Sequence, residues 1–285
     1  MRELSGHLDL CSINTATLGY REPIATVVDA VARAGFGAIC PWRRELDGGD
    51  VAAVSRRIRD AGLKVSGYCR STDIPALEPA RFLENIEDNR RALDQAAVLG
   101  AACFVMVVGS LPPGSRDLPA AWAQVEEGTA LLLDHARAAG VRLALEPLHP
   151  MYANDRSCLN TLEQALDMAD RIEPPTGRPP QLGVAVDLYH VWWDPKLAAG
   201  IARGGAGRRI LAFHVSDWLV PTRDLLTDRG MMGDGVVDIP RLRGLVEEAG
   251  YDGPVEVEVF SERDWWRRPI AETLDVCADR LQRVC

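Results

Sequence analysis

Four apolar segments in the second half of the chain each end in a residue that can bind a metal ion. The segment "LALE" ends at Glu146, "VAVD" at Asp187, "LAFH" at His214 and "VEVE" at Glu258. Taken alone, each has an ordinary explanation, because carboxylates at strand ends often cap helices and a lone histidine is usually hydrogen-bonded in the core. Together, three carboxylates in a site of low dielectric need protons or a cation to neutralise them. We therefore expect one divalent cation if the fold gathers these four side chains.

The ligand set also indicates which cation to expect. Three carboxylates and one imidazole are rich in oxygen and carry three negative charges, which suits an octahedral divalent ion. We expect Mn²⁺, with Mg²⁺, Co²⁺ or Zn²⁺ as alternatives. Four protein ligands would leave two coordination positions open, enough for a carbonyl oxygen and an adjacent hydroxyl of a sugar.

Short apolar runs that alternate with longer amphipathic stretches predict the elements that position these residues. The pattern recurs eight times in residues 1–285, which fits a single-domain (β/α)₈ barrel of about 250 residues. A doubly wound open sheet is the alternative, but no GxGxxG follows the first strand. In a barrel, the carboxyl ends of all strands face one pocket. The expected strands are 8–14, 38–42, 64–69, 103–108, 142–146, 183–187, 210–214 and 255–260.

Helices are expected between these strands, most clearly over 81–99, 122–139 and 160–170. Asn160 is the expected cap of the last helix, with Glu163 three residues further on. The segment "RGGAGRR" (203–209) precedes the seventh strand, so we expect a turn on the face away from the pocket rather than a phosphate site. Glycine is expected where helices end with a positive φ, namely at Gly35, Gly62, Gly100, Gly140 and Gly250.

Composition excludes several classes of partner. The formal net charge of −9 repels phosphate backbones, so nucleic acid is not expected as a partner. No 18-residue apolar run and no amino-terminal signal occur, and we expect a cytoplasmic protein without a membrane partner. The seven cysteines contain no CxxC pair, so we expect reduced thiols that mostly pack in the core.

Five segments together resemble a known family. They are "LALEPLHP", "VAVDLYHVWWDP", "AFHVSDW", "MGDGVVDIP" and "GYDGPVEVEVF", and they are similar to the xylose isomerase-like TIM barrel superfamily, in particular to its sugar phosphate isomerases/epimerases. The resemblance spans essentially the whole chain and implies a (β/α)₈ fold. It implies a divalent metal held by the four residues above, with Glu146 and Glu258 as the acid/base pair. It also implies that His190 contacts a substrate oxygen, and Asp217 of the HxxD motif is a further substrate-binding candidate.

The sequence offers two candidates for the substrate-binding arginine and two for the last metal-binding glutamate. In epimerases of this family an arginine soon after the metal histidine binds substrate, and the candidates here are Arg223 and Arg229, although neither has that tight spacing. Glu256 and Glu258 share one side of their strand because side chains alternate. We expect Glu258, nearer the carboxyl end, to be the ligand, and Glu256 to be a deeper partner of a base on a neighbouring strand.

Tryptophans follow several strands on the expected pocket face. Trp42 follows the second strand and Trp265 follows the eighth. Aromatic faces suit the C–H faces of sugars or an apolar aglycone, and we expect both residues to contact substrate, with packing between loops as the alternative.

The resemblance implies proton transfer next to a carbonyl, with the cation stabilising an enediolate. Returning the proton to the opposite face gives an epimer, and returning it to the adjacent carbon interconverts aldose and ketose. We expect such an isomerase or epimerase, acting on a small sugar. Expelling a β-substituent gives elimination, and the alternative is therefore a dehydratase or lyase of the inosose dehydratase or 3-oxo-C-glycoside type. His149, just beyond Glu146, is the candidate second proton shuttle for that reaction, or else a packing residue.

Two further classes are weighed against this expectation. A barrel resembling the apurinic endonucleases would need more histidine ligands and a basic groove, whereas this chain has five histidines and is acidic. A metal-free binding module or a subunit of a larger enzyme is the non-enzymatic alternative. The sequence leaves open whether the chain forms a homo-oligomer or serves as an accessory subunit.

Overall fold

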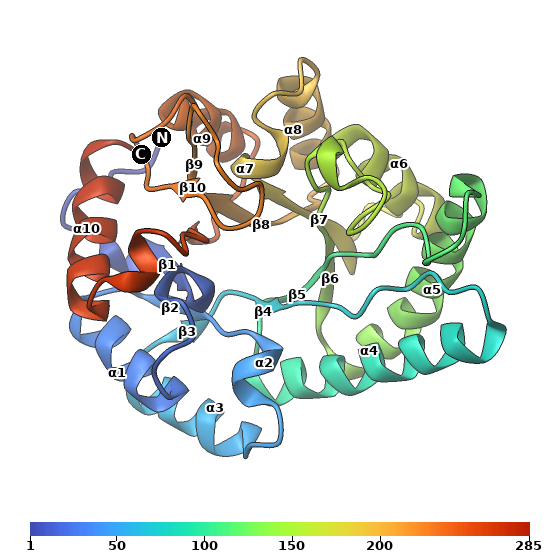
Figure 1. The fold of residues 1–285 in the computed structure, drawn as a ribbon, viewed down its shortest axis with the longest axis horizontal. Coiled ribbons are helices and arrows are strands. Elements are labelled where there is room, and N and C mark those ends of the chain that lie inside the picture. The colour runs from blue at the N-terminus through green and yellow to red at the C-terminus, as the bar shows by residue number, and fades with distance from the viewer.

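Eight parallel strand positions form a closed barrel at the centre of the molecule. The computed structural model describes all residues, 1–285, and Figure 1 looks down the barrel. All eight expected strands are confirmed, most of them shorter than expected. Residues Leu8–Leu10, for example, form the 3₁₀ turn η1 instead of the start of the first strand. The barrel strands are β1 (Cys11–Asn14), β2 (Ala38–Cys40), β3 (Lys64–Val65), β4 (Tyr68–Cys69), β5 (Cys103–Met106), β6 (Arg142–Leu145), β7 (Leu182–Asp187), β8 (Ile210–Val215) and β11 (Val255–Val257).

The sheet is closed rather than open, through a contact between the two ends of its strand order. This order runs β3-β2-β1-β11-β8-β7-β6-β5-β4. Strands β3 and β4 belong to one barrel strand, interrupted at Ser66 and Gly67, and together they match the expected strand 64–69. The backbone N–H of Ser66 donates to Ile39 O (3.1 Å) and that of Cys69 donates to Pro41 O (3.1 Å). The first bond extends the pairing of β3 with β2, and the second, with the parallel bridge between Trp42 and Cys69, joins β4 to the end of β2. This contact closes the barrel and excludes the doubly wound alternative.

Eight principal helices surround the barrel (Figure 1). None of the helices is both long and apolar enough to span a membrane. Two short helices, α2 (Arg43–Leu46) and α7 (Leu188–Val191), lie in the connections that follow β2 and β7. The principal helices are α1 (Ile24–Arg33), α3 (Val51–Asp60), α4 (Pro79–Leu99), α5 (Leu118–Ala139), α6 (Leu162–Ile172), α8 (Leu197–Ala206), α9 (Ile239–Glu248) and α10 (Ile270–Arg283).

The helix boundaries confirm the glycines expected at helix ends, and they correct two other expectations, for the cap of α6 and for residues 203–209. The five glycines expected at helix ends all have positive φ, between 71° and 94°. Thr161 rather than Asn160 caps α6, because the Thr161 side chain accepts the N–H of Gln164 (3.1 Å), while the Asn160 amide donates to Leu148 O (3.0 Å). The expected turn over 203–209 was wrong in part, since 203–206 are the last residues of α8.

Small and apolar side chains fill the barrel below its carboxyl end. Ala144, Ala185 and Ala212 pack there with three buried cysteines, Cys40, Cys69 and Cys103. All seven cysteines are unpaired thiols and six are buried, as the composition led us to expect. Burial raises the pKa of the Cys103 thiol to about 12, so this sulfur is a neutral packing group.

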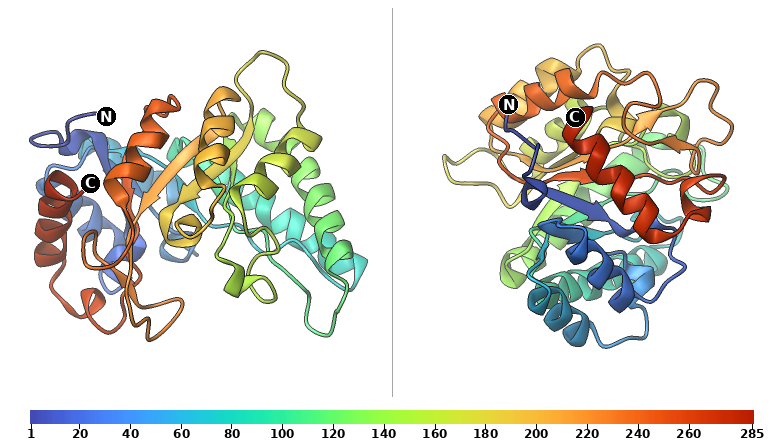
Figure 2. Two further views of the ribbon diagram at one scale, coloured as in Figure 1. Left: turned by 90° about the horizontal axis from the view of Figure 1, so that it is seen from above. Right: turned by 90° about the vertical axis from the view of Figure 1, so that its left-hand side faces the viewer.

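The connections divide between two faces of the barrel. In the left panel of Figure 2 the segments that follow the strands extend along the lower side, whereas the 173–181 connection projects from the upper side. The long connection after β8 contains two short strands, β9 (Asp217–Trp218) and β10 (Arg229–Gly230), which pair antiparallel. Short 3₁₀ turns occupy three other connections on this face: η2 (Thr15–Leu18), η3 (Pro150–Tyr152) and η4 (Trp265–Arg267). The candidate site lies beneath these segments.

Candidate active site

Four side chains meet at the carboxyl end of the barrel. Glu146, Asp187, His214 and Glu258 are all buried, and each offers one ligand atom within 4.8 Å of those of the other three. We call these four residues the quartet. The barrel ladder fixes two of them, since Glu146 N–H donates to Met106 O (3.0 Å) and Glu258 N–H donates to Val215 O (3.1 Å). Asp187 is the last residue of β7 and His214 lies in β8.

Unpartnered atoms in the quartet fit a cation. Glu146 Oε1 and His214 Nδ1 are buried and have no hydrogen-bond partner. They lie 3.4 Å apart, and Glu258 Oε2 lies 3.6 Å from the same ring nitrogen. Leaving such groups buried and unsatisfied costs about 1–3 kcal/mol each. A divalent ion would satisfy both, so the residues present suit a metal, and Glu146, Asp187, His214 and Glu258 would hold it.

The charges of the quartet perturb one another strongly. Burial, with repulsion from Glu258 and Asp187, raises the pKa of Glu146 to about 7. Burial alone would also raise the pKa of Glu258, but the Arg229 guanidinium and His214 outweigh it and lower that pKa. Burial opposes the charge on His214, yet the surrounding carboxylates raise its pKa well above the usual range. The cluster therefore has an excess of negative charge that attracts cations.

Glu256 lies directly beneath His214. Its Oε1 accepts a hydrogen bond from Asn14 Nδ2 (3.0 Å) and its Oε2 accepts one from Ser66 Oγ (2.6 Å). His214 Nε2 lies 3.5 Å from Glu256 Oε1. A carboxylate on this side keeps the ring proton on Nε2, which leaves the Nδ1 lone pair for the cluster above. This is the deeper position that the strand alternation predicts for Glu256.

Arg229 is the buried cation of the site. It belongs to β10, and its Nη1 donates to Asp187 Oδ2 (2.8 Å) and to Glu258 Oε2 (3.1 Å). Burial opposes its charge, but these two carboxylates outweigh that effect and raise its pKa. Its guanidinium also lies 4.7 Å from the ring centre of Phe260. Of the two arginine candidates, the structure brings only Arg229 into the site.

His190 lies on the same side of the site as Arg229. Its Nε2 is 3.1 Å from Arg229 Nη2 and 3.6 Å from Asp187 Oδ2, while the backbone N–H of His149 donates to its Nδ1 (3.2 Å). Burial lowers the pKa of His190 to about 3. The imidazole is therefore neutral and offers hydrogen bonds rather than charge.

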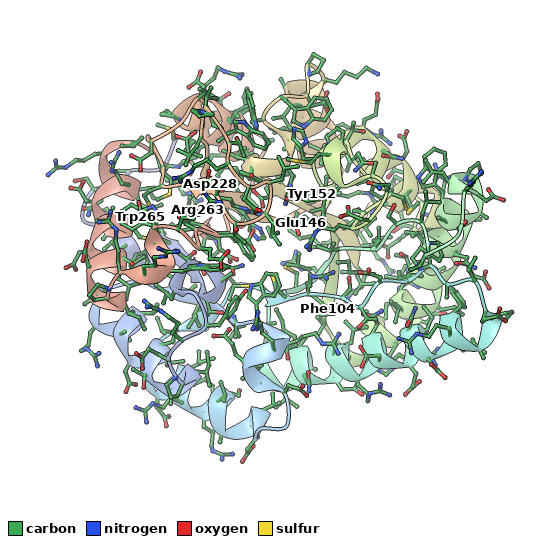
Figure 3. The ribbon with its side chains drawn as sticks, viewed as in Figure 1. Phe104, Glu146, Tyr152, Asp228, Arg263 and Trp265 are labelled. Carbon is green, nitrogen blue, oxygen red and sulfur yellow. The ribbon has the colours of Figure 1, made fainter.

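A cavity of about 240 Å³ opens above the quartet. Glu146, Glu258, His190 and Arg229 form part of its lining. Figure 3 shows Glu146 and Tyr152 near the centre of the barrel opening. Aromatic side chains supply much of the wall, as expected of a site for the C–H faces of a small organic molecule. They are Tyr20, Trp42, Tyr152, Phe260 and Trp266.

Four of the expected catalytic and substrate-binding residues do not line this cavity. Arg223 pairs instead with Asp228 through its Nε (2.9 Å). Asp217 accepts the backbone N–H groups of Gly233 and Val237, both at 2.9 Å, and so holds the connection before α9 in place. In Figure 3, Trp265 lies toward α10, away from Glu146.

The fourth of these residues is His149. Its ring stacks on Trp218 with the ring centres 4.9 Å apart, and its edge meets Trp193. Nδ1 accepts the N–H of Met151 (3.3 Å). Burial lowers the pKa of His149 below its usual value. These contacts correspond to the packing alternative for His149.

Several cavity residues had no individual place in the sequence interpretation. Among them are Tyr20, Arg44, Tyr152, Arg156, Leu226 and Phe260. Phe260 lies two residues beyond Glu258 on the same strand path, so strand alternation alone signals its direction. Tyr152 and Arg156 follow β6 by several residues, and only the turn η3 brings them back over the pocket.

Comparisons with known proteins agree with this architecture. A family model described as the xylose isomerase-like TIM barrel matches residues 28–280. L-ribulose 3-epimerase of Methylomonas sp. (strain DH-1) is 26% identical over 274 residues, which cover 91% of this chain and 85% of the epimerase. A 3-dehydroshikimate dehydratase of Pseudomonas aeruginosa is 26% identical over 87% of this chain, but the match spans only 38% of the dehydratase.

Solved structures give the same fold. Protein SMc04130 of Sinorhizobium meliloti 1021 is 49% identical with a TM-score of 0.94, and the match covers 98% of this chain and 99% of that one. The IOLI protein, solved with a binding zinc atom, has a TM-score of 0.79 at 17% identity, covering 96% and 97% of the two chains. The closed barrel, the buried quartet and the match over residues 28–280 define one family. The chain belongs to the xylose isomerase-like TIM barrel family.

Proposed function

We propose that this protein is a divalent-metal-dependent isomerase or epimerase of a small sugar, which moves a proton next to a carbonyl group. The observation that carries the proposal is the cavity floor, where Glu146 and Glu258 both line the cavity and both contact His214 Nδ1, at 3.4 and 3.6 Å. A metal held by the quartet would polarise the carbonyl and stabilise the enediolate charge.

Each acidic residue has a role in this proposal. One of the two carboxylates, Glu146 or Glu258, removes the proton next to the carbonyl, and the other returns a proton from a different direction. They approach the floor from β6 and β11, with β7 and β8 between them in the sheet. Return to the opposite face of the same carbon inverts its configuration. Arg229 and His190, already within 3.1 Å of one another, offer hydrogen bonds that orient the substrate oxygens.

The relatives support an isomerase or epimerase, and they also support a dehydratase as a second candidate. The epimerase from Methylomonas matches over most of its own length, and the IOLI protein was solved with zinc on the same fold. The dehydratase match keeps elimination as the second candidate. Elimination needs an acid for its leaving group, and the His149 ring packs against Trp218 outside the cavity. Proton return by the two carboxylates needs no further group, which favours epimerisation or isomerisation.

Deuterium exchange separates these candidates. Mn²⁺-loaded protein is incubated in D₂O with ketoses, inososes, 3-oxo-glycosides and 3-dehydroshikimate, and the products are followed by NMR. Deuterium next to the carbonyl of an epimer or isomer supports the proposal. Release of water or an aglycone supports the second candidate. Protein that binds the metal but exchanges no proton in any of these compounds contradicts both.

A further inference from the structure

The wall of the active-site cavity carries three arginines besides Arg229. Arg44, Arg70 and Arg156 all line it. The only acidic side chains in the lining are those of Glu146 and Glu258, which belong to the quartet. This local excess of positive charge stands out in a chain whose formal net charge is −9. We call the three residues the arginine rim.

Protein carboxylates hardly neutralise the arginine rim. The Arg44 guanidinium lies 4.3 Å from the ring centre of Tyr20, and that of Arg156 lies 5.6 Å from the ring centre of Tyr152. Neither guanidinium has an ion pair or a side-chain hydrogen bond in the structure. Arg70 alone has a carboxylate partner, Asp73, at 3.2 Å, and that contact is half-exposed. The aromatic rings hold the guanidinium planes without using their donors.

The floor of the cavity does not need the rim for its own charge balance. The quartet carboxylates have partners of their own, the His214 ring and Arg229, and none of them forms an ion pair with Arg44, Arg70 or Arg156. Arg229 already contacts Asp187 (2.8 Å) and Glu258 (3.1 Å). The positive charge of the rim is therefore available to a ligand rather than to the protein.

We propose that the substrate carries an anionic group, a carboxylate or a phosphate, which Arg44, Arg70 and Arg156 bind while the carbonyl end reaches the quartet. Guanidinium groups suit both anions because their planar N–H donors match two oxygens at once. The positions of the arginines support this arrangement, with the anion at one end of the cavity and the carbonyl group at the other. A wider, open cavity of about 850 Å³ adjoins the first, and the two share Trp42, Arg44 and Arg70 in their linings. Arg44 and Arg70 thus lie at the junction of the two cavities, whereas Arg156 lines the smaller cavity alone.

This inference rests on the proposed function and deepens it by naming the substrate class. It favours an anionic sugar or hydroxy-keto acid over a neutral ketose. A hydrogen bond to a charged group contributes roughly 10-fold or more to affinity. The rim arginines are exposed or half-buried, so their substitution leaves the core intact.

Three ketoses that differ only at one carbon test the proposal. D-Fructose, D-fructuronate and D-fructose 6-phosphate carry a hydroxyl, a carboxylate and a phosphate at C6. Calorimetric titration of the Mn²⁺-loaded protein measures their dissociation constants directly, without requiring turnover. We expect at least one anionic compound to bind about 10-fold or more tightly than D-fructose, and the tighter of the two identifies the carboxylate or the phosphate. Equal affinity for all three, or no binding of either anion, overturns the proposal.

Variants assign the effect to the rim. Arg44→Gln combined with Arg156→Gln should remove the preference for the anion and leave the affinity for D-fructose and for Mn²⁺ unchanged. Arg33→Gln is the matched control, because Arg33 is exposed on α1 and lines neither cavity. An anion preference that survives in the double variant overturns the role of the rim. Failure of the proposed function is separate: it appears as absent Mn²⁺ binding or absent deuterium exchange in wild-type protein.

Discussion

Glu256 makes the clearest prediction about the metal centre, because it acts on the quartet through a single contact. Glu256→Gln preserves the shape of the side chain but removes its charge from beneath His214, 3.5 Å away. The amide oxygen can still accept from Asn14. The amide nitrogen then faces Ser66, whose hydroxyl can accept as well as donate. We therefore expect the variant to fold.

The substitution of Glu256 should weaken the binding of Mn²⁺. Carboxylates that orient a metal-binding histidine typically contribute about 10–100-fold, which corresponds to about 1.4–2.7 kcal/mol. Since the hydrogen bonds to Glu256 can rearrange, we expect the loss to lie near 10-fold. Titration with Mn²⁺, followed by the electron paramagnetic resonance of the free ion, measures it.

A matched variant makes the result interpretable. Glu247 is also a carboxylate whose side chain is only 5% exposed, paired with Arg2 and Arg243 away from the site. Glu247→Gln should leave the Mn²⁺ dissociation constant unchanged. The reasoning is refuted if Glu256→Gln retains the wild-type circular dichroism and binds Mn²⁺ as tightly as the wild type.

Three further outcomes follow. Chelation should lower the melting temperature measured by calorimetry by about 4–5 °C, relative to protein in free Mn²⁺ at 100 times the dissociation constant. Metal binding at that concentration contributes about 2.7 kcal/mol, and the unfolding entropy is about 2.1 cal/mol/K per residue. An unchanged melting temperature would argue against the metal. Gly183→Ala should lower the free energy of unfolding in urea by about 1–3 kcal/mol, because the new Cβ would lie 2.2 Å from Arg209 O. Gly244→Ala, in open space on α9, is the control and should not destabilise the protein. His149→Phe keeps an aromatic ring on Trp218 and should retain deuterium exchange; its loss in a folded variant would place His149 in the proton path.

The sequence was sufficient for the barrel and for the quartet because both depend on short-range patterns. An apolar run that ends in Glu146 or Asp187 marks the carboxyl end of a strand, and barrel geometry then directs those ends to one place. Glycine at helix ends has a similarly local cause, since the backbone there requires positive φ. Strand alternation likewise placed Glu256 one layer below Glu258.

The wall of the cavity could not be predicted in the same way, because loop paths place it. Arg229 enters the site only because β10 pairs with β9 and turns back over the barrel, whereas Arg223, six residues earlier, faces Asp228. Two adjacent tryptophans also face different surroundings, since Trp266 lines the cavity and Trp265 lies toward α10. No periodicity distinguishes neighbours in an irregular connection.

Local competition between caps explains the error at α6. Asn160 and Thr161 are both good capping residues, and sequence preference does not separate them. The Asn160 amide is used instead to bridge Leu148 O and Ser157 O, at 3.0 and 3.1 Å. A tertiary contact to the connection after β6 therefore decided which residue begins the helix.

The central claim is that one divalent cation binds among Glu146, Asp187, His214 and Glu258. Crystals grown with Mn²⁺ and measured at the manganese absorption edge test it directly through the anomalous difference density. We predict one strong peak in contact with all four side chains. Crystals that bind Mn²⁺ elsewhere, with no peak among these four groups, would contradict the account.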